Sequence, residues 1–315
     1  MDISACLITL NGEENIPRLM ESLKDCKDIW MGDGGSTDNM VELAKSLGAN
    51  VYLRPENKAT PTQEDIDLFT KTFGYLPKFT TQSSFLNAGE TRNEVITHAK
   101  NDWIFFPDVD EIVTWDFPLI QKMTEQYDEI ECNIIQKRDD KGNPLYFNRI
   151  SKLFRKDKCK WVGRTHEVIV GGTKKIYTDK MTINHYKKES KQGKVYETLE
   201  YAVLKDGDAR SMFYLAREYF YYKEYQKSLD MFERYMKVAT WRPEIAHAWL
   251  FMAQCCWQIQ KGDDSRKYCL NAIAVNPDFK EALLDMSEYT GEGQKQFWKR
   301  YGESATQENV IFKTI

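Results

Sequence analysis

The sequence predicts an α/β domain with a mainly parallel sheet flanked by helices, followed by an all-α domain. Short apolar runs alternate with helical spacing up to about residue 190, which is typical of a parallel sheet. From about residue 194 the strand-like runs stop, and Ala, Tyr, Leu and Trp recur at helical spacing. With 42% hydrophobic and 13% aromatic residues, the 315-residue chain can bury a core in each domain.

Four apolar runs are expected to form strands, at residues 3–10, 28–31, 50–54 and 103–108. Helices are expected over residues 16–23 and 41–47, the second ending at Gly48. In such sheets ligands gather at the carboxyl ends of the strands. Polar residues follow three of these ends, at Asn11 to Glu14, at Asp33 and at Asp108 to Glu111.

A long connection over residues 55–87 interrupts this pattern. It is polar and then aromatic, and the spacing of Ile66, Phe69 and Phe73 predicts one short helix. Connections of this length in a compact domain are usually lids, binding loops or disordered segments. Two interpretations stay open, a segment that covers or lines a ligand site at the strand ends, and a packed insert without such a role.

The C-terminal part shows an internal repeat. Pro243 and Pro277 are 34 residues apart, which is the period of tetratricopeptide (TPR) helix hairpins. Residues of two units fall where such repeats place their packing side chains: Met212, Leu215, Ala216, Tyr219, Ser228, Phe232 and Tyr235, then Trp249, Met252, Ala253, Cys256, Ser265, Cys269 and Ala272. A partial third unit begins at Leu283. The predicted domains are 1–192 with the insert, a TPR-like domain over 193–301, and a tail over 302–315; a generic helical bundle is the alternative to the repeat.

Charge, apolar stretches and cysteine spacing argue against several classes of protein. Charged residues are interspersed and the net charge is −4, which disfavours a nucleic-acid surface. We expect no membrane span and no signal peptide, because long apolar stretches and a basic N-terminal region are missing. The seven cysteines form no CxxC pair and most lie in apolar runs, so we expect reduced thiols and a cytoplasmic location. Residues 186–194 are basic and leave peripheral membrane contact open, beside a solvated linker.

Two acidic segments indicate the chemistry. In "FFPDVDE" the carboxylates of Asp108 and Asp110 follow a buried run, with few Lys or Arg nearby in sequence. Mg²⁺ and similar hard cations prefer carboxylate oxygens together with phosphates, so a metal–diphosphate site is expected there. In "GDGGSTDN" two glycines allow a tight turn behind Asp33, and Ser36 or Asp38 can cap the next helix. A solvated strand end and a simple turn aspartate are the structural alternatives.

The order of the motifs resembles that of family 2 glycosyltransferases of the GT-A fold. The matching segments, over about residues 3–187, are "LITLNGEENI", "DIWMGDGGSTDN", "AGETRNEVITHAKNDWIFFPDVDE", "WVGRTHEVI" and "INHY". The branch that includes lipopolysaccharide-core glucosyltransferases looks most similar, and some peptide-modifying members with TPR-like C-termini also look similar. One departure is Gly12, which turns the usual T-x-N-E into T-L-N-G-E and leaves open whether Glu13 or Glu14 meets the nucleotide.

The resemblance implies a role for each matching residue. Asp33 would accept from the uracil of a UDP-sugar, and Asp110, His185 and Asp108 would bind Mn²⁺ or Mg²⁺, with Asp108 also near the ribose. Glu167 would act as the catalytic base. The other nucleotide-sugar residues would be Thr9, Leu10, Asn11, Glu13 and Arg92. Trp161 and His166 are candidates for the acceptor pocket, and a core role for Trp161 is equally open.

The predicted function is therefore an inverting, metal-dependent transfer of a sugar from a nucleotide-sugar to a hydroxyl of a glycan or lipid-linked saccharide. A positioned carboxylate would accept the proton of that hydroxyl. Transfer to a protein or peptide side chain, with the TPR-like domain binding the acceptor, is an alternative. A nucleotidyltransferase and an inactive TPR-type scaffold are further alternatives, and a homo-oligomer formed through the TPR-like domain stays open.

Overall fold

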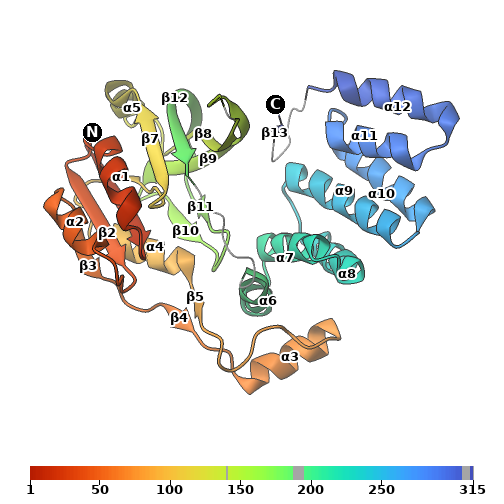
Figure 1. The fold of residues 1–315 in the computed structure, drawn as a ribbon, viewed down its shortest axis with the longest axis horizontal. Coiled ribbons are helices and arrows are strands. Elements are labelled where there is room, and N and C mark those ends of the chain that lie inside the picture. Colours follow the sequence, from red (N-terminus) through yellow and green to blue (C-terminus); the bar gives the residue numbers. More distant parts are fainter. Residues whose placement is uncertain (140, 187–194, 307–312, 315) are drawn as a thin grey trace. The chain divides into compact units, whose positions relative to one another are not determined.

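The computed structural model describes residues 1–139, 141–186, 195–306 and 313–314 of the chain (Figure 1). Two compact units are present. We call them the α/β unit, which comprises Met1–Thr60, Ser83–Gln192 and Thr314–Ile315, and the helical unit, which comprises Pro61–Gln82 and Gly193–Lys313. The basic segment 186–194, apart from Tyr186, and residues 307–312 and 315 of the predicted tail lie outside the described residues.

The α/β unit is built on one mixed sheet with the strand order β3-β2-β1-β6-β9-β8-β12-β7. Strands β3, β2, β1 and β6 are parallel to one another, whereas β9 is antiparallel to both β6 and β8. The bounds are β1 (Ile3–Thr9), β2 (Asp28–Asp33), β3 (Asn50–Leu53), β6 (Trp103–Phe105), β7 (Glu111–Trp115), β8 (Glu129–Arg138), β9 (Pro144–Arg155) and β12 (Lys175–His185). The predicted α/β class is confirmed, and the four predicted strands are β1, β2, β3 and β6.

Short helices and two ribbons complete this unit. The helices are η1 (Glu13–Asn15), α1 (Ile16–Ser22), α2 (Met40–Ser46), α4 (Ala88–Ile96) and α5 (Phe117–Met123), and the ribbons pair β4 (Lys58–Ala59) with β5 (Phe85–Leu86) and β10 (Lys160–Val162) with β11 (Val168–Val170). Strand β6 is fully buried, and its side chains lie in one apolar cluster with those of β1. Strands β1 and β6 are parallel and end at the same edge of the sheet, so the polar residues that follow them lie at that edge.

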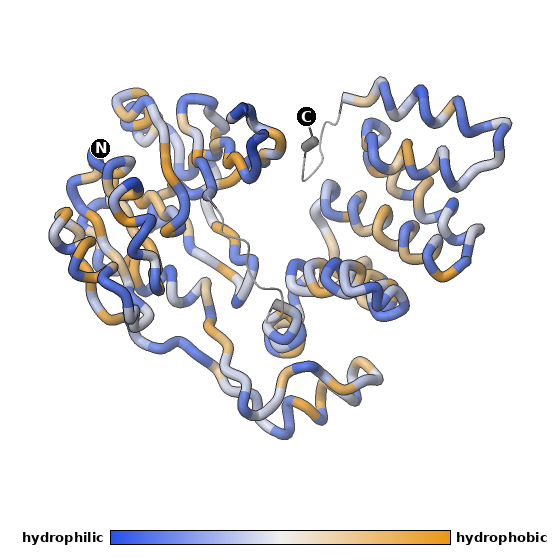
Figure 2. The backbone as a smooth tube through the Cα atoms, in the orientation of Figure 1, coloured by the Kyte–Doolittle hydropathy of each residue, from blue (hydrophilic) through white to orange (hydrophobic). Residues whose placement is uncertain are grey.

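The helical unit consists of helix hairpins, as the second half of the sequence predicts. Its helices are α3 (Gln63–Phe73), α6 (Val195–Asp206), α7 (Ala209–Tyr221), α8 (Tyr225–Tyr235), α9 (Arg242–Gln258), α10 (Gly262–Val275), α11 (Lys280–Tyr289) and α12 (Glu292–Ser304), and β13 (Lys313–Thr314) follows. Hydrophobic and hydrophilic stretches alternate along α9, α10 and α11 (Figure 2). The third repeat is a full hairpin, because α12 continues to Ser304, three residues past the expected end at 301.

The insert differs from the prediction, which attached all of residues 55–87 to the first domain. Residues 61–82 belong to the helical unit, and only the ends of the insert, at the β4–β5 ribbon, belong to the α/β unit. Helix α3 begins with a capping box between Thr62 and Asp65. Its Phe69 is fully buried, and Lys205 of α6 donates to Asp65 at 2.6 Å. Aromatic spacing predicted the helix. The Phe69 ring packs on Phe73 and Phe79 of the insert itself, and Phe73 packs against the apolar cluster of the later helices.

A buried carboxylate helps to fix the insert on the helices. Glu200 of α6 is fully buried and accepts from the backbone N–H of Lys78 at 2.6 Å and from the Tyr219 hydroxyl at 3.1 Å. That hydroxyl also lies 2.5 Å from the hydroxyl of Tyr75. Burial raises the pKa of Glu200 to about 7, although the two donors act in the opposite direction. The insert is therefore held in part by an acid that changes charge near neutral pH.

We expect the helical unit to lose stability as the pH rises from about 5 to 8. The folded-state pKa of Glu200 lies above the unfolded value, so the stabilisation is complete below the unfolded pKa and is lost as pH rises through about 7. Urea titrations at pH 5 and pH 8 measure this. The Glu200→Gln variant should remove about 3 kcal/mol of the pH dependence, whereas Glu233→Gln, at an exposed site on α8, should leave it unchanged. An equal pH dependence in both variants would contradict this assignment.

Two general properties complete the description. None of the described helices is both long enough and apolar enough to cross a membrane. The seven cysteines are all free and buried, as small apolar side chains in the cores. Burial raises the pKa of Cys6, Cys132 and Cys255, so these thiols stay protonated and unreactive.

Candidate functional site at the carboxyl edge of the sheet

The two acidic segments meet at one edge of the sheet. Strand β1 ends at Thr9 and β2 ends at Asp33, and these residues are register partners. Strand β6 ends at Phe105, and a turn over Asp108 to Glu111 leads into β7, with the Glu111 N–H donating to the Asp108 carbonyl at 3.0 Å. Because His185 of β12 pairs with Glu111 of β7, the late histidine reaches the same edge.

The positive charge that faces these acids comes from the protein itself. Lys152 of β9 is 3% exposed, and its ammonium donates to Asp108 at 2.7 Å and to Glu111 at 2.7 and 2.8 Å. Arg92 of α4 donates to the other oxygen of Asp108 at 2.8 Å and to Glu167 at 2.5 Å. Asp108 therefore has two cations close to it in space, although few Lys or Arg lie near it in the sequence. Sequence distance hid these cations, because they lie on other elements.

The charges in this network stabilise one another. Burial acts to raise the pKa of Asp108, but Lys152 and Arg92 outweigh it and hold that pKa well below its usual range. Burial acts to lower the pKa of Lys152 and of Arg92, and the neighbouring carboxylates hold both above their ordinary values. Burial raises the pKa of Glu111. Both oxygens of Asp108 are thus committed to cations, which leaves this carboxylate poorly placed to ligate a metal.

Asp110 and His185 form a separate pair beside this network. His185 Nε2 lies 3.3 Å from Asp110 Oδ2, and the other ring nitrogen lies 2.8 Å from Gln136 Oε1 on β8. The bond to His185 lowers the pKa of Asp110, and the same bond raises the pKa of His185. The Asp110 carbonyl also accepts from the N–H of Tyr186 at 2.8 Å, which joins the two strand ends.

The donor set of this pair fits a divalent cation that a ligand helps to hold. Within the described residues no group of three His, Cys, Asp or Glu side chains is arranged to hold a metal ion. One carboxylate oxygen and one imidazole nitrogen are available from Asp110 and His185, and Mg²⁺ typically takes one or two carboxylates and completes its shell with water and phosphates. The pair therefore fits Mn²⁺ or Mg²⁺ together with a diphosphate, whereas each oxygen of Asp108 accepts from a cation of the protein.

The base candidate lies on the turn between β10 and β11. Arg92 holds one oxygen of Glu167, whose side chain is 12% exposed. His166 precedes it with a φ of 51°, in the left-handed region that few residues other than glycine adopt. Trp161 is buried, and its ring packs against Phe106, with the Arg92 guanidinium 4.9 Å from the ring centroid. Trp161 is thus a core residue beneath Arg92, which is the structural alternative named above.

Asp33 closes a tight turn. Its carboxylate accepts from the N–H groups of Gly35 and Ser36, both at 3.0 Å, and from the Ser36 hydroxyl at 2.5 Å. Gly35 has a φ of +91°, which explains the glycine in this turn. Asp33 is 5% exposed, so three local donors occupy the carboxylate that the resemblance assigns to uracil. Its role toward a nucleotide stays a prediction.

The residues after β1 are hydrogen-bonded to the loop that follows β2. Asn11 accepts from the N–H of Thr37 at 2.8 Å, and Glu13 accepts from the N–H of Asn39 at 3.1 Å. Thr9 is buried, whereas Leu10 is 55% exposed. Glu13 is therefore bonded to the turn after β2, and Glu14 is exposed. Of the predicted nucleotide residues after β1, Leu10 and Asn11 are exposed, and Asn11 is bonded to Thr37.

Close packing explains why a glycine occupies position 12. A Cβ atom at this position would lie 2.8 Å from Val109, the central residue of the Asp-Val-Asp motif. The departure from the family pattern thus lets the loop after β1 approach the acidic turn after β6.

Sequence reasoning missed three residues of this edge, namely Lys152, Glu111 as its partner, and Gln136. The signal for Lys152 was present, because a single lysine in the apolar strand "ISKLF" is buried and needs a counter-charge. Gln136 carried no such signal, since polar residues are ordinary near the end of a strand.

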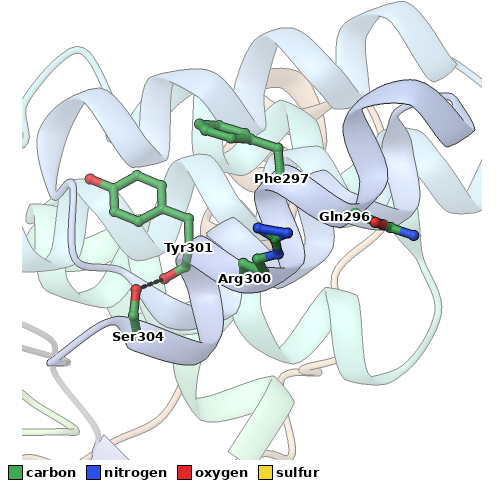
Figure 3. A pocket seen from close by; sticks show the side chains of 5 residues that line it. All are labelled: Gln296, Phe297, Arg300, Tyr301 and Ser304. Carbon is green, nitrogen blue, oxygen red and sulfur yellow. Dashed lines mark hydrogen bonds between the residues drawn. The ribbon is translucent and has the colours of Figure 1, made fainter.

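A shallow pocket on α12 is the other candidate. It is lined by Gln296, Phe297, Arg300, Tyr301 and Ser304, and the Ser304 hydroxyl donates to the Tyr301 carbonyl at 2.9 Å (Figure 3). Phe297 is 62% exposed. Two aromatic rings, a guanidinium, an amide and a hydroxyl suit contact with another molecule's surface better than sugar transfer.

Comparisons with known proteins give a distant likeness. The chain is 26% identical over 203 residues to an uncharacterized glycosyltransferase of Rickettsia bellii (strain RML369-C), which covers 58% of this chain and 59% of that protein. The chain thus spans about three-fifths of the length of this relative. No family model matches the chain.

Solved structures resemble parts of the chain at low sequence identity. MamA covers 35% of this chain and 64% of its own, at 20% identity and a TM-score of 0.30. Glucosyl-3-phosphoglycerate synthase from Mycobacterium tuberculosis, in complex with Mn²⁺, UDP and glucosyl-3-phosphoglycerate, covers 42% of this chain and 44% of its own, at 18% identity and a TM-score of 0.28. Both likenesses are partial, so the assignment of the site rests on its own geometry.

Proposed function

We propose that this protein is a glycosyltransferase that moves a sugar from a nucleoside diphosphate sugar, a UDP-sugar first, to an acceptor hydroxyl. The observation that carries this proposal is the Asp110–His185 pair, 3.3 Å apart at the carboxyl edge of the sheet. The likeness to the Rickettsia bellii protein supports the same class. A glycan or lipid-linked saccharide is the first acceptor class, and a protein side chain is the second.

Each residue of the edge has a proposed part in this reaction. Asp110 and His185 would hold Mn²⁺ or Mg²⁺, which would supply positive charge to the leaving diphosphate. Arg92 fixes Glu167 through one oxygen, so the other oxygen would accept the proton of the attacking hydroxyl. The new bond joins that hydroxyl oxygen to the anomeric carbon as the bond to the diphosphate breaks. Asp108 and Lys152 hold the acidic turn in place rather than touching the metal.

The first test is nucleotide binding measured by thermal unfolding. UDP with Mn²⁺ should raise the midpoint of unfolding, since a ligand at about 100 times its Kd stabilises the native state by about 2.7 kcal/mol. GDP, CDP and dTDP, each with and without Mn²⁺, are the matched comparisons. A shift with another nucleotide would support the proposed transferase activity but contradict the contact with uracil that is assigned to Asp33. If none of the four produces a metal-dependent shift, the inactive scaffold becomes the better explanation.

A further inference from the structure

A relay of amide side chains lies behind His185. Gln136 on β8 presents its Oε1 to His185 Nδ1 at 2.8 Å, and its Nε2 donates to Asn148 Oδ1 on β9 at 3.4 Å. Asn148 in turn donates through Nδ2 to the backbone carbonyl of Arg149 at 3.2 Å. Three side chains on three neighbouring strands of one sheet are thus connected in a single row.

The direction of this relay is fixed at its far end. A backbone carbonyl can only accept a hydrogen bond, so Asn148 must turn its NH₂ group toward Arg149. Its oxygen then faces Gln136, which must donate through its own NH₂ group. The oxygen of Gln136 therefore faces the imidazole, and His185 must carry a proton on Nδ1. The Arg149 carbonyl, which can only accept a hydrogen bond, therefore fixes the orientation of both amide side chains.

The direction of these hydrogen bonds determines which ring nitrogen of His185 carries no proton when the ring is neutral. A neutral imidazole carries one proton, and with that proton on Nδ1 the Nε2 atom presents a lone pair. The lone pair faces Asp110 Oδ2 at 3.3 Å, so a proton that charges the ring there forms the bond to Asp110, and a divalent cation would take the place of that proton. Two acceptors in this arrangement attract a cation between or beside them. Hydrogen bonding of the second nitrogen is the usual means by which a protein fixes a histidine ligand.

We propose that Gln136 is a positioning residue that holds His185 in the tautomer that binds a divalent cation through Nε2. The inference rests on the proposed function and adds to it a residue outside the predicted site. Gln136 touches neither metal nor substrate. It acts through the direction of the hydrogen bond that Asn148 and the Arg149 carbonyl impose.

Metal affinity is the first measurement. Mn²⁺ titrations in the presence of UDP, followed by the loss of the free-ion electron paramagnetic resonance signal, compare four proteins. Gln136→Leu should weaken Mn²⁺ binding about 10–100-fold, because its apolar side chain leaves the tautomer undetermined. Gln136→Glu keeps an acceptor oxygen and should bind Mn²⁺ within a few-fold of the wild type. Gln126→Leu, the same change at an exposed position, should match the wild type.

The tautomer is measured separately, in the metal-free protein. Nitrogen-15 NMR of the imidazole rings distinguishes Nδ1–H from Nε2–H, and His185 is assigned among the four histidines by the signal missing in His185→Gln. At a pH where the ring is neutral, the wild type should show Nδ1–H and Gln136→Leu a mixture. An Nε2–H tautomer in the wild type, or Mn²⁺ affinity unchanged within twofold in Gln136→Leu, would overturn the inference. Wild-type protein that shows Nδ1–H but does not bind Mn²⁺ with UDP would instead contradict the proposed function.

Discussion

Replacing Lys152 by methionine is expected to lower the free energy of unfolding by about 3–5 kcal/mol. The ammonium is buried and donates to both Asp108 and Glu111, so its loss leaves the fully buried Glu111 carboxylate without a cation. The midpoint of thermal unfolding should fall by roughly 10 °C. Calorimetry or urea titration of the full chain measures the effect.

Two controls separate this mechanism from a general loss of packing. Lys158→Met removes a lysine that is 52% exposed and 3.9 Å from its acidic neighbour, and should cost less than about 1 kcal/mol. Adding Glu111→Leu to Lys152→Met should restore more than half of the loss, because no buried charge is then left unpaired. Failure of the double variant to recover would show that packing, and not charge, causes the loss.

The effect of Lys152→Met should also depend on pH. Without the ammonium, burial holds the pKa of Glu111 still further above its unfolded value, so the folded state binds the proton more readily. The variant should therefore be least impaired near pH 4, and its deficit should grow as the pH rises through the folded-state pKa of Glu111.

The second large effect is expected for Asp110→Asn. The change keeps the shape of the side chain but removes its charge. We expect Mn²⁺-dependent UDP binding to weaken by at least about 100-fold. This effect is larger than the one expected when a residue that only positions a metal ligand is lost. At a ligand concentration that stabilises the wild type by about 4.1 kcal/mol, the variant should retain no more than about 1.4 kcal/mol. Thermal unfolding with UDP, with and without Mn²⁺, measures both values.

The stability of the metal-free variant serves as its own control. Asp110 is 26% exposed, and its side-chain partner is His185, so the unfolding midpoint without ligands should move by only a few degrees. Asp179→Asn, at a 70% exposed position on β12, should leave the UDP shift intact. An Mn²⁺-dependent shift that persists in Asp110→Asn would remove this residue from the proposed metal site.

Local patterns in the sequence predicted the framework of the site well. The run before Asp108 forms a buried strand, and the acids after β1, β2 and β6 reach one edge, because strand periodicity and parallel pairing follow from neighbouring residues. The helix of the insert and the hairpins after residue 194 were predicted for the same reason. These features depend on spacing within about ten residues.

Features that depend on distant partners were not predicted. The cation for Asp108 comes from Lys152, 44 residues away, on a strand whose antiparallel position no local pattern reveals. The aromatic face of the insert was visible in the sequence, but its partners lie 122 to 162 residues further on. Likewise, Asp33 has the residue type of a nucleotide ligand, and only the structure shows its three local donors.

The placement of residues 61–82 in the helical unit has a consequence for synthesis on the ribosome. The partners of this segment in α7 and α8 follow 144 and 162 residues later. At bacterial-to-eukaryotic elongation rates of about 5–20 residues per second, its aromatic side chains wait roughly 8–30 s before they can be covered. During that interval the nascent chain exposes Phe69, Phe73 and Phe79. A chaperone that binds aromatic segments would find its site there, and would be released when α8 emerges.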